Sequence, residues 1–258
     1  MVSLKEQIVF ITGASSGIGR ACAFAFAAEG ARLLLTARRR ERLEALRSEL
    51  TAAGAKHLHL LTLDVQRRTD VEQAWKALPA EWRPIDILVN NAGLSRGLDK
   101  LHQGSIEDWE EMIDTNVKGL LYVSRAVIPG MVERGRGHIL NLGSTAGDIT
   151  YPLGAVYCAT KAAERAVNDG MRQDLLGTPV RVTSVDPGMV ETEFSEVRFR
   201  GDRDRAAKVY QGLTPLTAAD VADAILWAAT RPPHVNIARI SMTTIDQANS
   251  YLFNRKPQ

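Results

Sequence analysis

The sequence contains three side chains that can take part in proton transfer, and a fold can bring them together. Tyr157 and Lys161 are four residues apart, so on a helix they share one face. A phenol ionises only near pH 10, but a close ammonium group favours the phenolate, typically by ~1 to 3 pH units. Ser144 follows an apolar run that ends at Leu142, and its hydroxyl can hydrogen-bond a substrate oxygen. The three residues predict proton exchange with an alcohol or a carbonyl compound, with Tyr157 as the acid/base.

The Tyr–Lys pair is weak evidence when it is taken alone. Tyr and Lys at helical spacing are usually an exposed surface pair with no part in catalysis. The interpretation therefore depends on the motifs and the fold that the rest of the chain supplies.

A glycine-rich turn near the N-terminus is typical of nucleotide binding. The segment Thr12–Gly19 follows an apolar strand and leads directly into an amphipathic helix. The first helical turn carries unpaired backbone N–H groups, so a pyrophosphate can bind there when no Cβ blocks its approach. An ordinary turn with incidental glycines is the alternative, but strand and helix lie where the motif requires them. The predicted cofactor contacts in this turn are Gly13, Ser15, Ser16, Gly17, Ile18 and Gly19.

The residues after the second strand predict which dinucleotide binds. An acidic residue at this place would hold the ribose hydroxyls of NAD, but residues 36–40 read TARRR. Arg38 and Arg39 can instead bind a 2′-phosphate through paired N–H donors, which favours NADP. The alternative is a solvated helix start in which the arginines pair with Glu41 and Glu44. Because cations in a first helical turn oppose the helix dipole, a compensating anion supports the NADP interpretation.

Alternating apolar and amphipathic stretches predict the fold that positions these residues. We expect an α/β protein, a single Rossmann-type doubly wound parallel sheet of about seven strands with helices on both faces. The strands are expected at residues 8–11, 32–36, 57–63, 85–89, 138–142, 181–185 and 237–242. The helices are expected at residues 18–29, 39–53, 70–78, 105–134, 155–176 and 217–230. Such sheets bind ligands at the carboxyl ends of their strands, which is where Ser144 lies.

The remaining segments predict one domain with a substrate lid. Pro187-Gly188 closes the sixth strand and opens a charged segment with little periodicity, Met189–Thr214, which we interpret as a mobile lid. Thr217 and Asp220 form a candidate capping box for the last helix. A chain of 258 residues is short enough to build one core, so residues 1–258 are expected to form a single dinucleotide-binding domain.

Composition excludes several classes of function. A net charge of +2 with a pI near 8.6 is too balanced to predict binding to nucleic acid or to an anionic membrane. The N-terminus has no apolar signal core and the chain no apolar run long enough to span a bilayer, which favours a cytoplasmic location. Cys22 and Cys158 are expected to be buried hydrophobic residues without a disulfide. His57 and His59 have no third ligand nearby, so no metal site is predicted.

Several motifs together resemble the short-chain dehydrogenase/reductase family. They are the glycine turn, Asn90-Asn91-Ala92-Gly93, Ser144, the run from Tyr157 to Lys161, and Pro187-Gly188, in the family's usual order over nearly the whole chain. The resemblance implies hydride transfer with nicotinamide, and it implies that Lys161 also holds the nicotinamide ribose. It implies that Asn116 completes the catalytic set by anchoring a water and proton relay to the lysine.

The same resemblance implies further cofactor contacts. Asp64 and Val65 would face the adenine, and Asn91–Gly93 would pass beneath the adenosine ribose, although a strand end and a turn are the alternative interpretation of both. Val190 and Thr192 would contact the nicotinamide carboxamide. The full additional set is Asp64, Val65, Asn91, Ala92, Gly93, Tyr157, Lys161, Pro187, Gly188, Val190 and Thr192.

Longer segments are similar to a narrower group. Residues 78–82, 108–116, 126–134 and 193–201 look like those of NADP-dependent 3-hydroxy acid dehydrogenases acting on serine and allo-threonine. A carboxylate on such a substrate should meet a cation. The lid supplies Arg198, Arg200 and Arg203, and the loop after Asn91–Gly93 supplies Arg96; the residues alone do not choose among them.

Two other functions and one assembly remain open at this stage. A broad carbonyl or 3-oxoacyl reductase would use the same catalytic groups on a different substrate. A non-catalytic redox sensor would bind NADP without turnover, but intact Ser144, Tyr157 and Lys161 argue against it. The apolar faces of residues 116–133 and 155–176 are either interior packing or a subunit interface, and the family resemblance implies a homotetramer.

Overall fold

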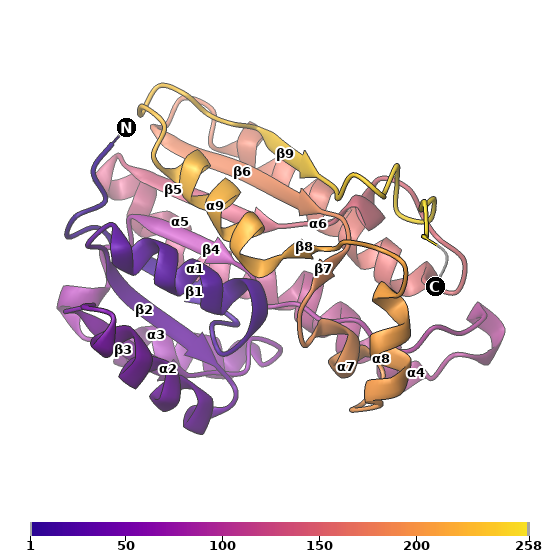
Figure 1. Ribbon diagram of the computed structural model, residues 1–258. Coiled ribbons are helices and arrows are strands. Elements are labelled where there is room, and N and C mark those ends of the chain that lie inside the picture. The colour runs from indigo at the N-terminus through magenta and orange to yellow at the C-terminus, as the bar shows by residue number, and fades with distance from the viewer. Residues whose placement is uncertain (1, 257–258) are drawn as a thin grey trace.

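The computed structural model describes residues 2–256, and its centre is a parallel sheet. The strands of the main sheet are β1 Ile8–Thr12, β2 Arg32–Ala37, β3 Leu58–Thr62, β4 Ile87–Asn90, β5 Gly137–Leu142, β6 Val180–Pro187 and β9 Arg239–Met242. Within the described residues these seven strands run in the order β3-β2-β1-β4-β5-β6-β9 (Figure 1). The order reverses between β1 and β4, which defines the switch point at which such sheets bind ligands. The predicted doubly wound sheet is therefore confirmed.

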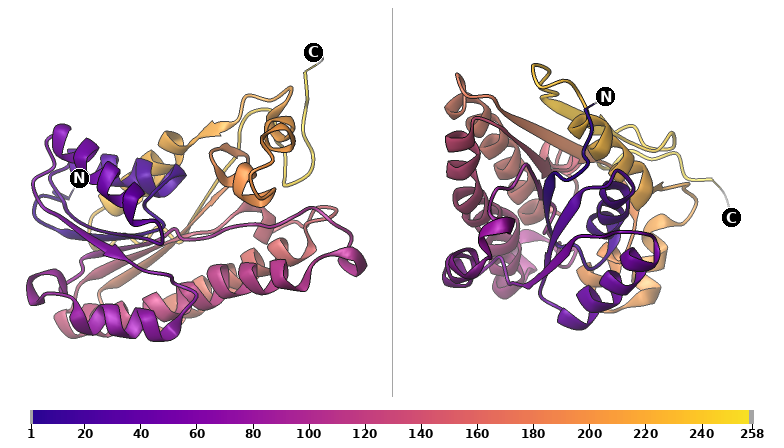
Figure 2. Two further views of the ribbon diagram at one scale, coloured as in Figure 1. Left: turned by 90° about the horizontal axis from the view of Figure 1, so that it is seen from below. Right: turned by 90° about the vertical axis from the view of Figure 1, so that its left-hand side faces the viewer.

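Helices cover both faces of this sheet (Figure 2). One face is covered by α1 Gly17–Ala28, α2 Arg40–Ala52 and α9 Ala218–Ala229, and the other by α3 Arg68–Ala77, α5 Leu120–Arg134 and α6 Ala155–Asp174. In β1, Val9 and Ile11 pack into the first layer, whereas Ile8 and Phe10 pack into the second. The strands read as continuously apolar because both of their faces are buried.

The expected helix over residues 105–134 is interrupted. It consists of α4 Ile106–Ile113, a π-helical turn over Asp114–Gly119, and α5. Short 3₁₀ turns, which hydropathy did not predict, occur at Ala80–Trp82, Leu101–Gln103 and Thr145–Gly147. A π turn keeps the chain helical and differs from an α-helix in its hydrogen bonding, which hydropathy does not report, so the sequence suggested one helix.

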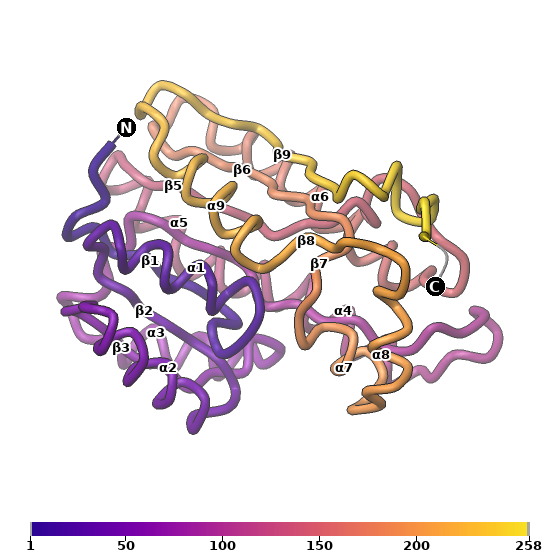
Figure 3. The backbone as a smooth tube through the Cα atoms, viewed as in Figure 1, coloured from indigo at the N-terminus to yellow at the C-terminus, as the bar shows by residue number. Residues whose placement is uncertain are grey.

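The segment 189–214 contains more secondary structure than its hydropathy pattern indicated. It contains β7 Val190–Glu191, α7 Phe194–Arg198 and α8 Arg203–Tyr210, and β7 pairs with β8 Leu216–Thr217 (Figure 3). Helices of this length show too few turns for a hydropathy period to appear. The Thr217/Asp220 capping box at the start of α9 is confirmed, because each residue's side chain accepts a hydrogen bond from the other's backbone N–H.

Two smaller sequence predictions concern cysteines and membrane insertion. Cys22 and Cys158 are buried and free, as expected. Burial raises the pKa of the Cys22 thiol to about 12, which is consistent with an inert packing role. Within residues 2–256, no helix has the length and apolar composition needed to cross a bilayer.

A buried histidine in β5 predicts a stability change in mild acid. The side chain of His138 lies within 2.8 Å of Thr183 Oγ1, which itself donates to Ile237 O. The histidine must therefore donate from Nε2, which leaves its Nδ1 buried without a partner among the described residues. Burial, and then the charge of Arg181, hold the pKa of His138 well below 6.5.

The folded protein therefore keeps His138 neutral while the unfolded chain takes up a proton. Stability is expected to fall as the pH drops from about 6.5 towards 5, by up to ~1.4 kcal/mol per pH unit from this group. Urea unfolding of His138→Gln should show a flatter dependence over that window, and His57→Gln, at an exposed side chain, serves as the control. An unchanged slope in His138→Gln would contradict the assignment.

Candidate active site

A cavity of about 490 Å³ lies at the carboxyl ends of the strands. Its walls come from the loops after β1 to β6, from α6 and from the 189–214 segment. The volume is in the range of ordinary ligand pockets. Most of the site residues predicted from the sequence line it: Gly13, Ser15, Ser16, Gly17, Ile18, Arg38, Arg39, Asp64, Val65, Asn91, Ala92, Gly93, Ser144, Tyr157, Lys161, Pro187, Gly188, Val190 and Thr192.

Hydrogen bonds join the two loops at the switch point of the sheet. Asn91 Nδ2 donates to Thr12 O at 2.8 Å and to Gly13 O at 3.2 Å. Thr12 Oγ1 accepts from the backbone N–H groups of Asn91 and Ala92, each at 3.0 Å. Asn91 therefore holds the glycine-rich turn in place, in addition to lining the cavity.

The glycine-rich turn has the backbone that an anion site requires. Gly13 and Gly17 have φ of +65° and +52°, which side chains rarely adopt. Gly19 lies behind the turn and does not line the cavity, but a Cβ there would approach Asn91 Nδ2 to 2.4 Å. The N-cap residue of α1, Ser16, makes no side-chain cap, and no acidic residue occupies the first turn. The N–H groups of this turn are thus free of side-chain anions.

Arg38 and Arg39 line the end of the cavity formed by the loop after β2, and their carboxylate partners are distant. Arg38 Nη1 is 3.9 Å from Glu111 Oε1, and Arg39 Nη2 is 3.7 Å from Glu193 Oε2, both beyond hydrogen-bond distance. The expected alternative pairing with Glu44 involves Arg40 instead, at 3.8 Å. Burial, and then repulsion from Arg42, lower the pKa of Arg39. This end of the cavity therefore retains uncompensated positive charge.

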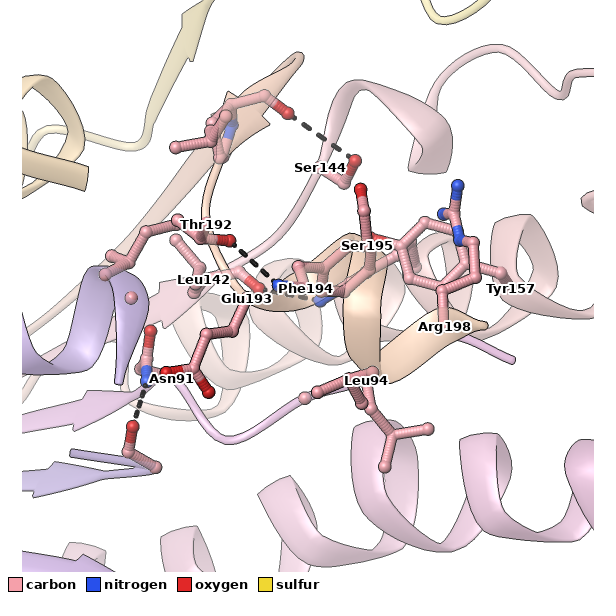
Figure 4. A pocket seen from close by; sticks show the side chains of 18 of the residues that line it. Asn91, Leu94, Leu142, Ser144, Tyr157, Thr192, Glu193, Phe194, Ser195 and Arg198 are labelled. Carbon is pink, nitrogen blue, oxygen red and sulfur yellow. Dashed lines mark hydrogen bonds between the residues drawn. The ribbon is translucent and has the colours of Figure 1, made fainter. Parts of the chain in front are cut away.

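Tyr157 and Ser144 lie in the same cavity at the other end of the site (Figure 4). Tyr157 is 8% exposed and its ring meets the edge of Phe194 at 5.7 Å between centroids. Ser144 Oγ accepts from Ala146 N at 3.1 Å and lies 3.5 Å from Pro187 O. The serine hydroxyl is thus anchored by its own backbone turn, while the phenol is held by aromatic packing.

Lys161 is buried below Tyr157 and has an acidic partner that sequence reasoning missed. Its Nζ lies 5.9 Å from the Tyr157 ring centroid and donates to Leu142 O at 3.0 Å. It also donates to the two carboxylate oxygens of Glu164, at 3.1 and 2.8 Å. Burial alone would lower the pKa of Lys161, but Glu164 and then Tyr157 outweigh it and raise that pKa. Burial raises the pKa of Glu164 to about 7 against the attraction of the lysine.

The spacing of residues in the sequence gave a weak indication that Glu164 belongs to the site. Tyr157, Lys161, Glu164 and Asn168 recur at helical spacing and are all buried in α6. A charged residue in this buried stripe needs a charged partner, and Lys161 is the only cation on it. The ion pair was therefore open to prediction from periodicity.

Asn116 lies behind the cavity and not in its wall. The side chain is 0% exposed and sits in the π-helical turn. Its Nδ2 donates to Leu94 O and to Thr160 Oγ1, each at 2.9 Å, and its Oδ1 accepts from Leu94 N at 2.9 Å. The amide thus fixes the loop after β4 against α6, one residue away from Lys161.

The C-terminal segment also contributes residues that sequence reasoning missed. Gln247 lines the cavity with Ser250, Phe253 and Arg255. Gln247 Oε1 accepts from Met189 N at 2.8 Å, and a Cβ on Gly188 would lie 2.1 Å from the same oxygen. The glutamine therefore ties this segment to the turn that follows β6. No periodicity or motif in the sequence singled it out.

Comparisons with known proteins agree with this geometry. A sequence model of the short chain dehydrogenase family matches residues 7–202. The NADP-dependent 3-hydroxy acid dehydrogenase of Salmonella typhi is 51% identical over 243 residues, 94% of this chain and 96% of that protein. The serine 3-dehydrogenase of Agrobacterium fabrum is 42% identical over 93% of this chain and 94% of that protein. The solved closed form of serine dehydrogenase complexed with NADP+ is 48% identical, with a TM-score of 0.91 over 97% of this chain and 100% of that one.

Proposed function

Because this chain belongs to the short-chain dehydrogenase family, we propose that it is an NADP-dependent oxidoreductase acting on a small 3-hydroxy acid such as serine or allo-threonine. One observation carries the proposal: Ser144, Tyr157 and Lys161 line the same cavity as the glycine-rich turn and the two arginines. The names of the similar proteins support the choice of cofactor and substrate class.

The donor set of the cavity fits NADP. The uncapped first turn of α1 offers backbone N–H groups to a pyrophosphate. Arg38 and Arg39, whose carboxylate partners are 3.9 and 3.7 Å away, offer guanidinium donors to a 2′-phosphate. Asp64, Val65, Val190 and Thr192 line the cavity. The family resemblance implies that the first two face the adenine and that the last two contact the nicotinamide carboxamide.

The catalytic roles follow from the chemistry of the three polar groups. When bound, NADP supplies the site that accepts or releases the hydride. Tyr157 Oη takes the proton from the substrate hydroxyl during oxidation and returns it during reduction. Ser144 Oγ, oriented by its bond from Ala146 N, holds the substrate oxygen beside the phenol. Lys161 places its ammonium group 5.9 Å from the centroid of the Tyr157 ring, and Asn116 positions the loop and helix around the lysine.

The same proposal extends to the lid, the location and the assembly. Residues 189–214 act as a mobile lid over the substrate and complete the single domain formed by residues 1–258. The protein functions in the cytoplasm and forms a homotetramer through α5 and α6. Leu121 and Val132 on α5 support this contact, since they are 41% and 40% exposed in the single chain.

A cofactor-consumption screen tests the proposed function. We expect NADP+ reduction with L-serine, L-allo-threonine and 3-hydroxyisobutyrate, at kcat/KM values above those for uncharged ketones assayed with NADPH. A broad carbonyl reductase would instead turn over the ketones and leave the hydroxy acids unchanged. A redox sensor would bind NADPH and turn over nothing, which would contradict any enzymatic assignment.

A further inference from the structure

Four arginines near the cavity are candidates to bind an anionic substrate, and the structure separates them. Arg96 is partly buried and donates to both carboxylate oxygens of Glu111 at 2.7 Å. Arg200 is ion-paired with Asp108, and Arg203 is 84% exposed with Glu196 as its partner. These three guanidinium groups already have carboxylates and do not line the cavity.

Arg198 differs from them in both respects. It lines the cavity, and within residues 2–256 it forms no ion pair with an acidic side chain. Its guanidinium carbon lies 5.1 Å from the Phe194 ring centroid and 5.5 Å from that of Tyr157. Figure 4 shows the Arg198 and Tyr157 side chains next to each other at the same end of the pocket. A cation without a counter-ion therefore lies beside the proposed acid/base.

Within residues 2–256, most of the N–H donors on Arg198 have no hydrogen-bond acceptor. Nη2 donates to Tyr151 Oη at 3.0 Å. The Nε atom is buried and has no hydrogen-bond partner in the described part of the chain. A guanidinium has five N–H donors in a planar fork, and a partly buried one left unpaired is costly. Contacts with aromatic faces offset part of that cost, but they leave the N–H groups unsatisfied.

Arg255 also lines the cavity but is a poorer candidate. Its side chain is exposed, and Nη2 donates to Val209 O at 3.1 Å while Nη1 donates to Gln211 O. The guanidinium is thus used to attach the C-terminal segment to the end of α8. Lys161 is no candidate either, since its three donors all have acceptors.

We infer that Arg198 binds the carboxylate of the substrate, an inference that rests on the proposed function and names the residue that recognises the acid. A carboxylate accepts two N–H donors from one guanidinium, which matches the unused edge of Arg198. In a 3-hydroxy acid only one carbon separates the carboxylate carbon from the carbon that bears the hydroxyl. The cation and the acid/base must therefore be neighbours, as Arg198 and Tyr157 are.

The position of Arg198 is supported by the loop after β4. Arg96 Nη1 donates to Val197 O, and Gly97 N donates to Arg198 O at 3.1 Å. Tyr151 holds the guanidinium from the other side, and its hydroxyl stays protonated because burial raises the pKa of Tyr151. The fork is thus held in place before any ligand binds, which reduces the entropy lost on binding.

The first test compares an acid with its uncharged ester. For Arg198→Met we expect kcat/KM for 3-hydroxyisobutyrate to fall by at least ~30-fold, while kcat/KM for its methyl ester changes by less than ~3-fold. Arg198→Lys should lose less, because it keeps the charge but not the fork. Arg203→Met, at an exposed arginine of the same segment, is the matched control and should behave as the wild type. Equal losses for acid and ester, or no loss for the acid, would overturn the inference.

The second test measures binding without turnover and keeps the inference separate from the proposed function. NADPH and 3-hydroxyisobutyrate cannot react with each other, so calorimetric titration of the acid into NADPH-loaded protein reports binding alone. Wild type should bind the acid, and Arg198→Met should bind it at least ~10-fold more weakly with unchanged NADPH affinity. Failure of the wild type to bind, or equal binding by the variant, would overturn the role of Arg198. Absence of turnover with all hydroxy acids would instead overturn only the proposed function.

Discussion

Tyr157→Phe is expected to lower kcat by about 10²- to 10⁴-fold while leaving the affinity for NADP nearly unchanged. The substitution removes only the hydroxyl that exchanges a proton with the substrate. The ring itself stays packed against Phe194, so the shape of the cavity is retained. Steady-state rates with a hydroxy acid and fluorescence titration with NADPH measure the two quantities separately.

A matched phenol elsewhere in the protein controls for loss of a hydroxyl in general. Tyr122 on α5 packs against a core cluster and does not line the cavity. Tyr122→Phe should therefore retain the turnover of the wild type. Turnover of Tyr157→Phe above about a tenth of the wild-type rate would show that another group transfers the proton.

Combined replacement of Arg38 and Arg39 by Ala is expected to weaken NADP binding by at least ~100-fold and NAD binding by less than ~5-fold. Hydrogen bonds to charged groups contribute roughly 1.5 to 3 kcal/mol each, and about 1.4 kcal/mol corresponds to a tenfold change in affinity. Only NADP carries the 2′-phosphate that these donors would meet. In the wild type the nearest carboxylates are 3.7 and 3.9 Å away and would not compete strongly with a phosphate.

Calorimetric titration with NADPH and NADH measures both affinities on the same preparation. Arg40→Ala is the control, because Arg40 lies outside the cavity and its side chain is 78% exposed. It should leave the preference for NADPH intact. A double variant that loses the two cofactors equally would rule out recognition of the 2′-phosphate by this pair.

Much of the fold followed from local pattern. The strand that contains Val9 and Ile11 was predicted to within one residue, since an apolar run between two turns has few alternatives in an α/β chain. The turn at Gly13 and Gly17 was predicted with its helix, because the backbone there has positive φ values that favour glycine. The capping box of α9 was equally local.

The features that the sequence did not predict depend mostly on interactions between distant parts of the chain. The π-helical turn that contains Asn116 differs from a continuous helix in its backbone hydrogen bonds, which hydropathy does not report. The structure of residues 189–214 depends on contacts such as the one from Gly97 N to Arg198 O. Gln247 reaches the site only because the chain returns to Met189 after β9.

The amino-acid sequence by itself determined the order of the elements, the glycine-rich turn and the residue types that carry the chemistry. Each of these depends on neighbours within about one helical turn or one strand, so a linear pattern contains it. Only the tertiary structure decided that the Lys161–Glu164 pair, which lies within one helical turn, is buried, and that Arg198, unlike Arg96, has no carboxylate partner within residues 2–256. Charges act through space, and whether one is compensated depends on which segments the fold brings within a few ångströms of it.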